Sequence, residues 1–173
     1  MEQFIPDIYQ KSIYTIDYQK LWNRGIRCLL FDLDNTLVPA SIHKANKKIK
    51  ALFEELKEKG FTVILFSNSG KKRLKPFKDE LEIDVLARAR KPLAKHFLRV
   101  MKEYHFTVSE VAMIGDQLLT DVWGGNKVGI TTILINPVSK KDFILTRFNR
   151  RIENRIIKKL RNNDLFIRGK YYD

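Results

Sequence analysis

The sequence predicts an α/β fold in which helices cover both faces of a parallel β-sheet. Three observations predict it: apolar runs without polar alternation, amphipathic segments between those runs, and polar or acidic residues where the runs end. Apolar runs without alternation are typical of strands buried on both faces, as in a parallel sheet. Strands that alternate with helices imply right-handed crossovers, which place the helices on the two faces.

The strands are predicted from five apolar segments, of which Ile26–Asp32 is the clearest. The same pattern recurs at Phe61–Ser67, Val111–Gly115 and Thr131–Ile135, with a weaker and shorter candidate at Asp84–Ala87. In folds of this kind ligands gather at the carboxyl ends of the strands.

The helices are predicted from the three- and four-residue spacing of apolar side chains between those strands. They are Lys44–Lys59, Lys71–Glu80, Pro92–Tyr104 and Leu118–Val128.

Length and composition indicate one domain with a sizeable core, because the chain has 173 residues and is 44% hydrophobic. We expect a core over about 26–136, an N-terminal extension over 1–25 and a basic C-terminal helical segment over 139–173. No run of eighteen apolar residues and no secretory signal is visible, and the single Cys28 cannot form an internal disulfide. These features predict a soluble protein of the cytoplasm.

Two aspartates end the first predicted strand, in the run Leu-Leu-Phe-Asp-Leu-Asp-Asn-Thr-Leu at 29–37. If the strand geometry continues, the carboxylates of Asp32 and Asp34 point to the same side. Like charges in a buried place repel each other and are costly to desolvate, so we expect a cation beside them. Mg²⁺ is the natural candidate, since it takes oxygen ligands from carboxylates, water and substrate phosphate.

An aspartate beside such a cation can attack phosphorus and form an acyl phosphate. We assign Asp32 as this nucleophile and Asp34 as the group that protonates the departing oxygen and later accepts a proton from water. The turn that follows offers backbone amides and the Thr36 hydroxyl to phosphate oxygens, so Asn35 and Thr36 are predicted phosphate-binding residues.

Further polar residues follow the later predicted strands. Ser67 and Asn68 could hydrogen-bond the phosphoryl group, and Lys91 could neutralise its charge. Asp116 is a predicted metal ligand, and Asp121 is a second ligand or a partner of Lys91 or of a metal-bound water. Each residue alone has an ordinary explanation as a helix cap or surface charge. Their occurrence at successive strand ends favours a phosphoryl-transfer site.

These motifs resemble those of the haloacid dehalogenase (HAD) superfamily over about Ile26 to Ile135. The four matching motifs are Asp32 to Thr36, Ser67-Asn68, Lys91-Pro92 and Gly115-Asp116 through Asp121. Within that superfamily the chain is similar to the bacterial YqeG family of subgroup IIIA, which is related to mitochondrial phosphatidylglycerophosphate phosphatases. The supporting features are Ser12-Ile13-Tyr14, Arg73 after Ser67-Asn68-Ser69, and Gly124-Gly125-Asn126 after Thr120-Asp121.

The resemblance implies a HAD-like Rossmannoid three-layer sandwich with sheet order 5-4-1-2-3. It also implies phosphomonoester hydrolysis with Mg²⁺ held by Asp32, the Asp34 backbone carbonyl and Asp116, and phosphatidylglycerophosphate as the leading substrate. Only 30 positions separate Leu37 from Ser67 and 23 separate Asn68 from Lys91, which leaves room for the crossover helices and no cap domain. We therefore expect an open site.

The C-terminal flank is strongly basic, with eleven Lys and Arg against four Asp and Glu from residue 139 onwards. Within 143–161 the spacing predicts a basic amphipathic helix. Its apolar face holds Leu145, Phe148, Ile152, Ile156 and Leu160, and its basic face holds Arg147, Arg150, Arg151, Arg155, Lys158 and Lys159. This helix could bind an anionic membrane, contact RNA or pack on the core, and among binding roles we favour the inner face of the membrane.

Two alternative functions remain open at this point. One is a phosphatase for a soluble sugar, nucleotide or protein phosphate. The other is a non-catalytic binding module associated with RNA or the ribosome, which uses the basic flank. The formal net charge of +13 suits phosphate, nucleic acid and anionic lipid alike.

Overall fold

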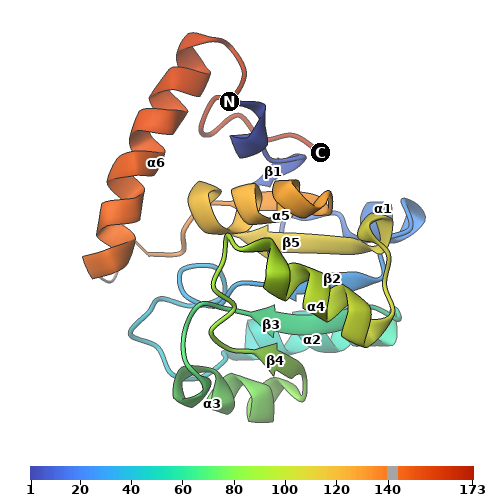
Figure 1. The fold of residues 1–173 in the computed structure, drawn as a ribbon. Helices are drawn as coiled ribbons and strands as arrows, with labels where there is room; N and C mark the ends of the chain where they lie inside the picture. The colour runs from blue at the N-terminus through green and yellow to red at the C-terminus, as the bar shows by residue number, and fades with distance from the viewer. Residues whose placement is uncertain (140–143) are drawn as a thin grey trace.

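The computed structural model describes residues 1–139 and 144–173, and it contains a six-stranded sheet (Figure 1). Every strand pair in the sheet is parallel, and the strand order is β1-β6-β5-β2-β3-β4. The strands are β1 (Ile8–Gln10), β2 (Cys28–Phe31), β3 (Thr62–Phe66), β4 (Asp84–Leu86), β5 (Val111–Gly115) and β6 (Thr131–Ile135).

The five predicted strands are all present, and their order from β6 to β4 is the expected 5-4-1-2-3. The strand β1 is an addition that the prediction did not include. It pairs with the outer edge of β6 through Ile8 opposite Ile133 and Gln10 opposite Ile135, so the N-terminal extension widens the sheet.

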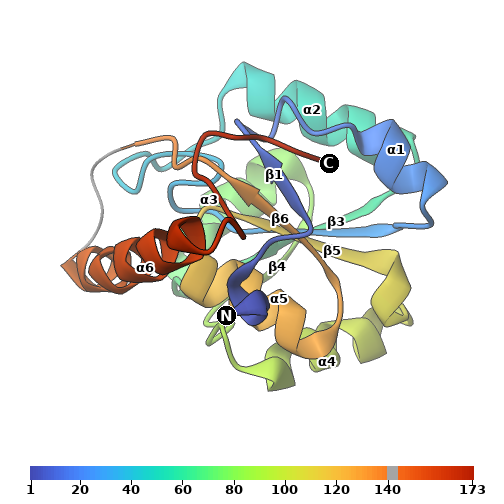
Figure 2. The same cartoon turned by 90° about the horizontal axis from the view of Figure 1, so that it is seen from above.

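Helices cover both faces of the sheet, as predicted. They are α1 (Tyr18–Asn23), α2 (Lys47–Glu58), α3 (Lys71–Leu81), α4 (Ala94–Tyr104), α5 (Trp123–Val128) and α6 (Ile144–Asn162), with short turns η1 (Glu2–Phe4), η2 (Val108–Glu110) and the π-helical η3 (Leu118–Val122). Figure 2 shows α1 and α2 on one side of the sheet and α4 and α5 on the other.

Alternate side chains of the central strands bind the two helical layers to the sheet. Phe31 of β2 packs against Phe53 of α2, with ring centroids 4.9 Å apart. Phe66 of β3 packs against Phe97 of α4 on the opposite face, at 4.6 Å. Burial of such large rings contributes strongly to folding. It holds the helices against the sheet, and the strands thereby keep their positions.

The carboxyl ends of the strands all open on one side of the molecule, at the left in Figure 1. The crossovers from β2 to β3 and from β3 to β4 contain α2 and α3 and no cap domain. The polar residues that follow the strands therefore share one edge of the sheet, which we call the carboxyl edge.

The C-terminal helix α6 stands at this same edge (Figure 1), and the chain after it returns to β1 through a bridge between Tyr9 and Tyr172. The predicted apolar face of α6 is divided: Leu160 is buried, whereas Phe148 is 61% exposed. Arg150, predicted on the basic face, turns toward the body of the protein. The side chains of Leu145 and Arg147 lie outside the described ones. Among the described helices, none combines the length and hydropathy needed to span a bilayer.

Candidate functional site

Three buried aspartates and one buried lysine meet where β2 and β5 end. The Lys91 ammonium donates to Asp32 Oδ1 and to Asp121 Oδ1, each at 2.7 Å. One carboxylate oxygen from each of Asp32, Asp116 and Asp121 lies within 4.8 Å of the other two. The register explains the meeting, because β2 and β5 are neighbours and Asp32 and Asp116 directly follow them. We call these three side chains the acidic cluster.

Burial is the largest electrostatic effect on the acidic cluster, and nearby cations oppose it. Burial raises the pKa of Asp32 to about 6, although the Lys91 charge opposes this rise. Burial also raises the pKa of Asp116 well above its ordinary value, and the neighbouring aspartates add to the effect. For Lys91, burial disfavours the cation, but Asp121 and Asp32 outweigh it, so the pKa of Lys91 is raised. The carboxylates are thus short of positive charge, while Lys91 stays protonated.

A glycine makes room for Asp121 in the acidic cluster. A Cβ atom placed on Gly115 would lie 2.1 Å from Asp121 Oδ2, well inside van der Waals contact. The same oxygen accepts a hydrogen bond from the Gln117 N–H at 3.1 Å. The Gly115-Asp116-Gln117 segment therefore fixes the carboxylate that faces Lys91.

The donor set of the acidic cluster fits a divalent cation with a preference for oxygen. Three convergent carboxylates from different positions of the chain are the hard ligands that Mg²⁺ takes. Such an ion would also offset the burial and the repulsion that raise the pKa values of Asp32 and Asp116. The residues present can therefore hold a divalent metal.

Asp34 lies apart from the acidic cluster and has partners of its own. Ser69 Oγ donates to Asp34 Oδ2 at 2.6 Å, and Arg73 donates to Asp34 Oδ1 from Nε at 3.1 Å and from Nη2 at 2.9 Å. The Arg73 Nη1 group donates to the carbonyl of Ile42 and lies 3.3 Å from His43 Nδ1. Arg73 therefore ties the carboxylate of Asp34 to the loop after β2.

The residues predicted to bind phosphate lie around the acidic cluster. Thr36 Oγ1 is 3.4 Å from Asp32 Oδ2 and 3.3 Å from Asp116 Oδ1. Asn35 has a φ of 62°, a left-handed conformation that asparagine tolerates, and its carbonyl accepts from the Val138 N–H. Ser67 is buried at the end of β3.

Asn68 binds the main chain of Lys91 with both ends of its amide. Its Oδ1 accepts from the Lys91 N–H at 2.7 Å, and its Nδ2 donates to the Lys91 carbonyl at 3.1 Å. This pairing joins the loop after β3 to the loop after β4. It holds the backbone from which the Lys91 side chain reaches the acidic cluster.

Two residues of α6 that sequence reasoning did not place at the site reach it from the C-terminal segment. Arg150 Nη1 donates to the Asp116 carbonyl at 2.8 Å, and Nη2 contacts Asp116 Oδ2. Glu153 is fully buried, accepts from Arg150 at 3.0 Å and accepts from the Leu119 N–H at 3.0 Å. No motif or spacing in the sequence signals these contacts, because they depend on how α6 turns against η3.

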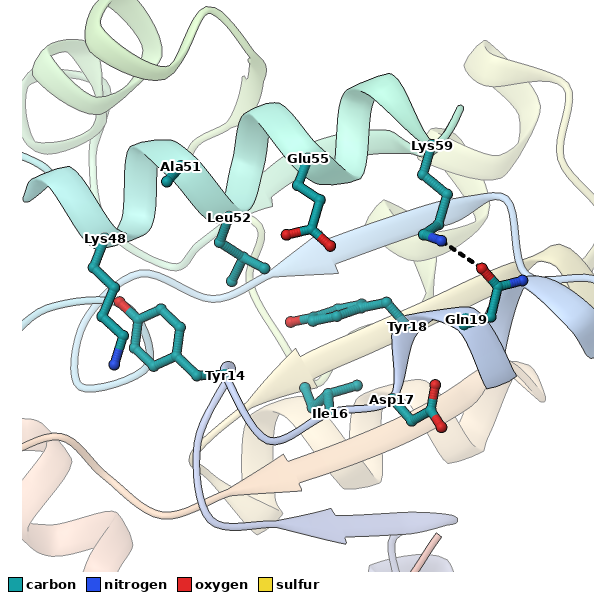
Figure 3. Close-up of a pocket in the computed structure, with 10 residues that line it drawn as sticks. All are labelled: Tyr14, Ile16, Asp17, Tyr18, Gln19, Lys48, Ala51, Leu52, Glu55 and Lys59. Atoms are coloured by element: carbon teal, nitrogen blue, oxygen red, sulfur yellow. Dashed lines mark hydrogen bonds between the residues drawn. The ribbon is translucent and has the colours of Figure 1, made fainter.

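Cys28 and a surface hollow lie away from the acidic cluster. Burial raises the pKa of the Cys28 thiol to about 12, so it stays protonated inside β2, as expected of a structural cysteine. A hollow of about 480 Å³ lies between the 14–19 segment and α2 (Figure 3). Its lining mixes Lys48 and Lys59 with Glu55 and Asp17, and it includes no residue of the acidic cluster.

Comparison with known proteins gives this fold and site a family. The family model described as mitochondrial PGP phosphatase matches residues 1–139. The chain is 42% identical over 158 residues to the "Probable phosphatase YqeG" of Bacillus subtilis (strain 168). The alignment covers 91% of this chain and 92% of that protein. It is 30% identical over 174 residues to phosphatidylglycerophosphate phosphatase 1, chloroplastic/mitochondrial, of Arabidopsis thaliana, covering 91% of this chain and 48% of that protein.

Solved structures agree on the fold. The cobalt-bound deoxy-D-mannose-octulosonate 8-phosphate phosphatase (YrbI) of Haemophilus influenzae aligns with a TM-score of 0.53 at 16% identity, over 81% of this chain and 91% of that one. A structure described as a "putative HAD superfamily (subfamily III A) hydrolase" of Legionella pneumophila aligns with a TM-score of 0.54 at 18% identity, over 72% of this chain and 76% of that one.

The fold, the acidic cluster and these relatives define a phosphatase that hydrolyses phosphate monoesters. Within that class, the chain belongs to the mitochondrial PGP phosphatase family, whose model covers its sheet and site. The helix α6 lies beyond the matched residues.

Proposed function

We propose that the chain is a Mg²⁺-dependent phosphatase that works through an aspartyl-phosphate on Asp32, and that its substrate is phosphatidylglycerophosphate. The observation that carries the mechanism is the Lys91 ammonium, 2.7 Å from both Asp32 and Asp121 within a group of three carboxylates. This arrangement orients an ionised Asp32 oxygen and supplies positive charge for a phosphoryl group that approaches it.

In the first step, an Asp32 carboxylate oxygen forms a bond to phosphorus while the bond from phosphorus to the ester oxygen breaks. Asp34, in its protonated form, gives a proton to the departing alkoxide, which leaves as an alcohol. In the second step, Asp34 takes a proton from water, whose oxygen attacks phosphorus and releases phosphate from Asp32. The position of Asp34 outside the acidic cluster, held by Ser69 and Arg73, supports this division of roles.

Asp32, Asp116 and Asp121 would hold Mg²⁺ with the Asp34 backbone carbonyl, which is two residues from Asp32. When bound, Mg²⁺ supplies charge neutralisation for the phosphoryl oxygens. Lys91 and the hydroxyls of Thr36 and Ser67 would bind the same oxygens, together with amides of the turn at Asn35. We assign Asn68 to positioning Lys91, since both ends of its amide bind the Lys91 main chain.

The lipid substrate is inferred from the relatives and from the crossovers. Two relatives, from Arabidopsis thaliana and Chlamydomonas reinhardtii, are named phosphatidylglycerophosphate phosphatases, and the described crossovers from β2 to β3 and from β3 to β4 hold no cap domain. A phosphate at the edge of a large body, such as a lipid headgroup at the inner face of the membrane, can reach such a site. We accordingly propose that the protein works in the cytoplasm, peripheral to that membrane.

The test is a comparison of phosphate release from phosphatidylglycerophosphate, glycerol 3-phosphate, a nucleotide and a sugar phosphate, each with Mg²⁺ and with chelator. We expect the lipid to be preferred, Mg²⁺ to be required, and Asp32→Asn to lose at least about a thousandfold in turnover on every ester. Unchanged turnover in Asp32→Asn would refute the mechanism. A preference for a soluble ester would refute the lipid assignment and leave the mechanism intact.

A further inference from the structure

Four large apolar side chains stand exposed on different segments at the carboxyl edge. They are Ile42 in the loop after β2, Leu93 just before α4, Val138 after β6 and Phe148 near the start of α6, with exposed fractions of 43, 54, 46 and 61%. We call these four side chains the apolar rim. Figure 1 shows the segments that carry them on the same side of the sheet, around the strand ends.

Each member of the apolar rim is tied to the site. The carbonyl of Ile42 accepts from Arg73, which holds Asp34, and the Val138 N–H donates to the Asn35 carbonyl at 2.9 Å.

Leu93 and Phe148 are tied to the site through the chain. Leu93 follows Lys91 by two residues, and Phe148 precedes Arg150, the partner of Asp116, by two. The four side chains therefore stand on segments that contact the residues of the site at the carboxyl edge.

Positive charge lies beside the apolar rim. Arg88 and Arg90 are exposed in the loop after β4, and Lys71 and Lys72 are exposed at the start of α3. The Arg88 N–H donates to the Ser69 carbonyl at 2.9 Å, and Ser69 is two residues before Lys71, which begins α3. These cations thus lie at the same edge as Ser69, which bonds Asp34.

We propose that the apolar rim inserts into the surface of an anionic phospholipid bilayer while these cations bind its headgroups, so that the site opens onto the membrane. The inference rests on the proposed lipid substrate, and it names the surface of the protein that binds the membrane in which that lipid lies. Separate apolar projections at one edge can all touch a flat bilayer at once, and burial of each stabilises the contact. The anionic headgroups complement the cations, and each Lys or Arg near such a surface adds to the attraction.

A nucleic acid would bind the cations through its phosphates but would leave the apolar rim without a partner. Phosphates attract Lys and Arg, whereas three of the four rim side chains are aliphatic and neither bind phosphate nor stack on bases as aromatic rings do. A contact that depends on Leu93, Val138 and Phe148 as well as on the arginines therefore distinguishes a bilayer from nucleic acid.

The experiment measures sedimentation of the full chain with vesicles of phosphatidylcholine and phosphatidylglycerol, or of phosphatidylcholine alone. The matched pair is Val138→Ser and Val108→Ser, because both valines are 46% exposed and Val108 lies at the opposite edge, in η2 before β5. We expect Val138→Ser to lower the partition coefficient about threefold, Leu93→Ser with Phe148→Ser to lower it about tenfold, and Val108→Ser to leave it unchanged.

Two double variants that remove positive charge, one at each edge of the sheet, complete the design. Arg88→Gln with Arg90→Gln is expected to weaken binding to the anionic vesicles about tenfold, whereas Arg24→Gln with Lys102→Gln, at the far edge after α1 and within α4, has little effect. Turnover of a soluble phosphate monoester and the midpoint of thermal unfolding should stay unchanged in every rim variant, which shows that each protein is folded.

Equal vesicle binding by the Val138 and Val108 variants would overturn the proposal. So would absence of vesicle binding together with salt-dependent binding of single-stranded RNA that the Arg88 and Arg90 substitutions remove. Rim-dependent vesicle binding without hydrolysis of phosphatidylglycerophosphate would uphold the docking surface and refute the substrate, so the two failures are distinguishable.

Discussion

Asp32 and Asp34 are separated by one residue, yet their carboxylates lie in different surroundings. The Asp32 side chain is 9% exposed and shares the ammonium of Lys91, which is 2% exposed, with a second carboxylate. The Asp34 side chain is 17% exposed, accepts from the hydroxyl of Ser69, and pairs with the guanidinium of Arg73, which it shares with no other carboxylate among the ion pairs of the described residues. The chain thus builds two carboxylate sites of different character from a single short motif.

The different surroundings suit two different catalytic roles, that of the nucleophile and that of the general acid and base. A buried carboxylate among other carboxylates needs a shared cation to stay ionised, and this suits a nucleophile that awaits phosphorus. A carboxylate near solvent with fixed donors can exchange protons with water, and this suits an acid and base. Substitutions that affect one site and spare the other test this comparison.

The largest effect is expected from Lys91→Met, which removes the cation that Asp32 and Asp121 share. Two buried carboxylates lose their partner, so the free energy of unfolding should fall by about 3–5 kcal/mol and turnover should be lost. Urea unfolding at neutral pH measures the change. Added Mg²⁺ should restore part of the stability, since it can replace the missing charge.

The matched control for that variant is Lys75→Met. Lys75 pairs with Asp79 on the surface of α3, where the two side chains are 73% and 56% exposed, so its loss should change stability by less than about 0.5 kcal/mol. If the Lys91 and Lys75 variants unfold at the same urea concentration, the shared cation is not what stabilises the acidic cluster.

The next largest effect is expected from Asp34→Asn, and it should depend on the leaving group. With an alkyl phosphate, which needs a proton on the departing oxygen, turnover should fall by about 10²–10⁴. With p-nitrophenyl phosphate, whose leaving group departs without a proton, the first step survives and only hydrolysis of the aspartyl-phosphate is slow.

Rapid-mixing kinetics measure this difference for Asp34→Asn. A burst of nitrophenol stoichiometric with the enzyme should precede slow turnover, while Asp32→Asn gives no burst. Equal losses on both esters, with no burst, would contradict the assignment of Asp34.

Sequence alone predicted the aspartates and the lysine that gather at the site, but not Arg150 and Glu153 of α6. The runs that end at Asp32, Ser67 and Asp116 lack polar alternation, so they predict buried parallel strands, whose carboxyl ends meet at one edge. The structure brings Asp32, Lys91 and Asp121 together there. Strand β1 was not predicted, because three residues give too short an apolar pattern and its partner β6 lies more than a hundred residues away.

The side-chain partners could not be predicted, for a different physical reason. The contacts of Arg73 with Asp34 and of Arg150 with Asp116 depend on rotamers and on how α3 and α6 turn against the sheet. Spacing favoured Phe148 as part of one apolar face of α6, but the buried Glu153 and its bond to the Leu119 N–H set the helix rotation. The spacing of apolar residues along a helix carries no information about an isolated buried polar contact such as that of Glu153.

A smaller effect is expected from Arg73→Ala, which removes the side chain that orients Asp34. Turnover of an alkyl phosphate should fall by about tenfold to a hundredfold, because the carboxylate loses a fixed direction but keeps its chemistry. The burst amplitude with p-nitrophenyl phosphate should stay complete.

Two further variants interpret the Arg73 result. Arg73→Lys keeps the charge but cannot reach both Asp34 and the Ile42 carbonyl, so rescue by lysine would show that charge alone matters. Arg99→Ala is the control, since Arg99 forms an exposed pair with Glu103 on α4 and should have normal turnover.

The smallest effect is expected at the third cation of the site, Arg150, which contacts Asp116 Oδ2. Arg150 and a divalent cation are drawn to the same carboxylate, so Arg150→Ala should tighten Mg²⁺ binding by about fivefold, on the order of 1 kcal/mol. Isothermal titration of the full chain measures this affinity without substrate, and Arg151→Ala, an exposed neighbour on α6, is the control. Weaker binding in Arg150→Ala would instead mean that the guanidinium orients Asp116 for the cation, and α6 would then support the acidic cluster rather than compete for it.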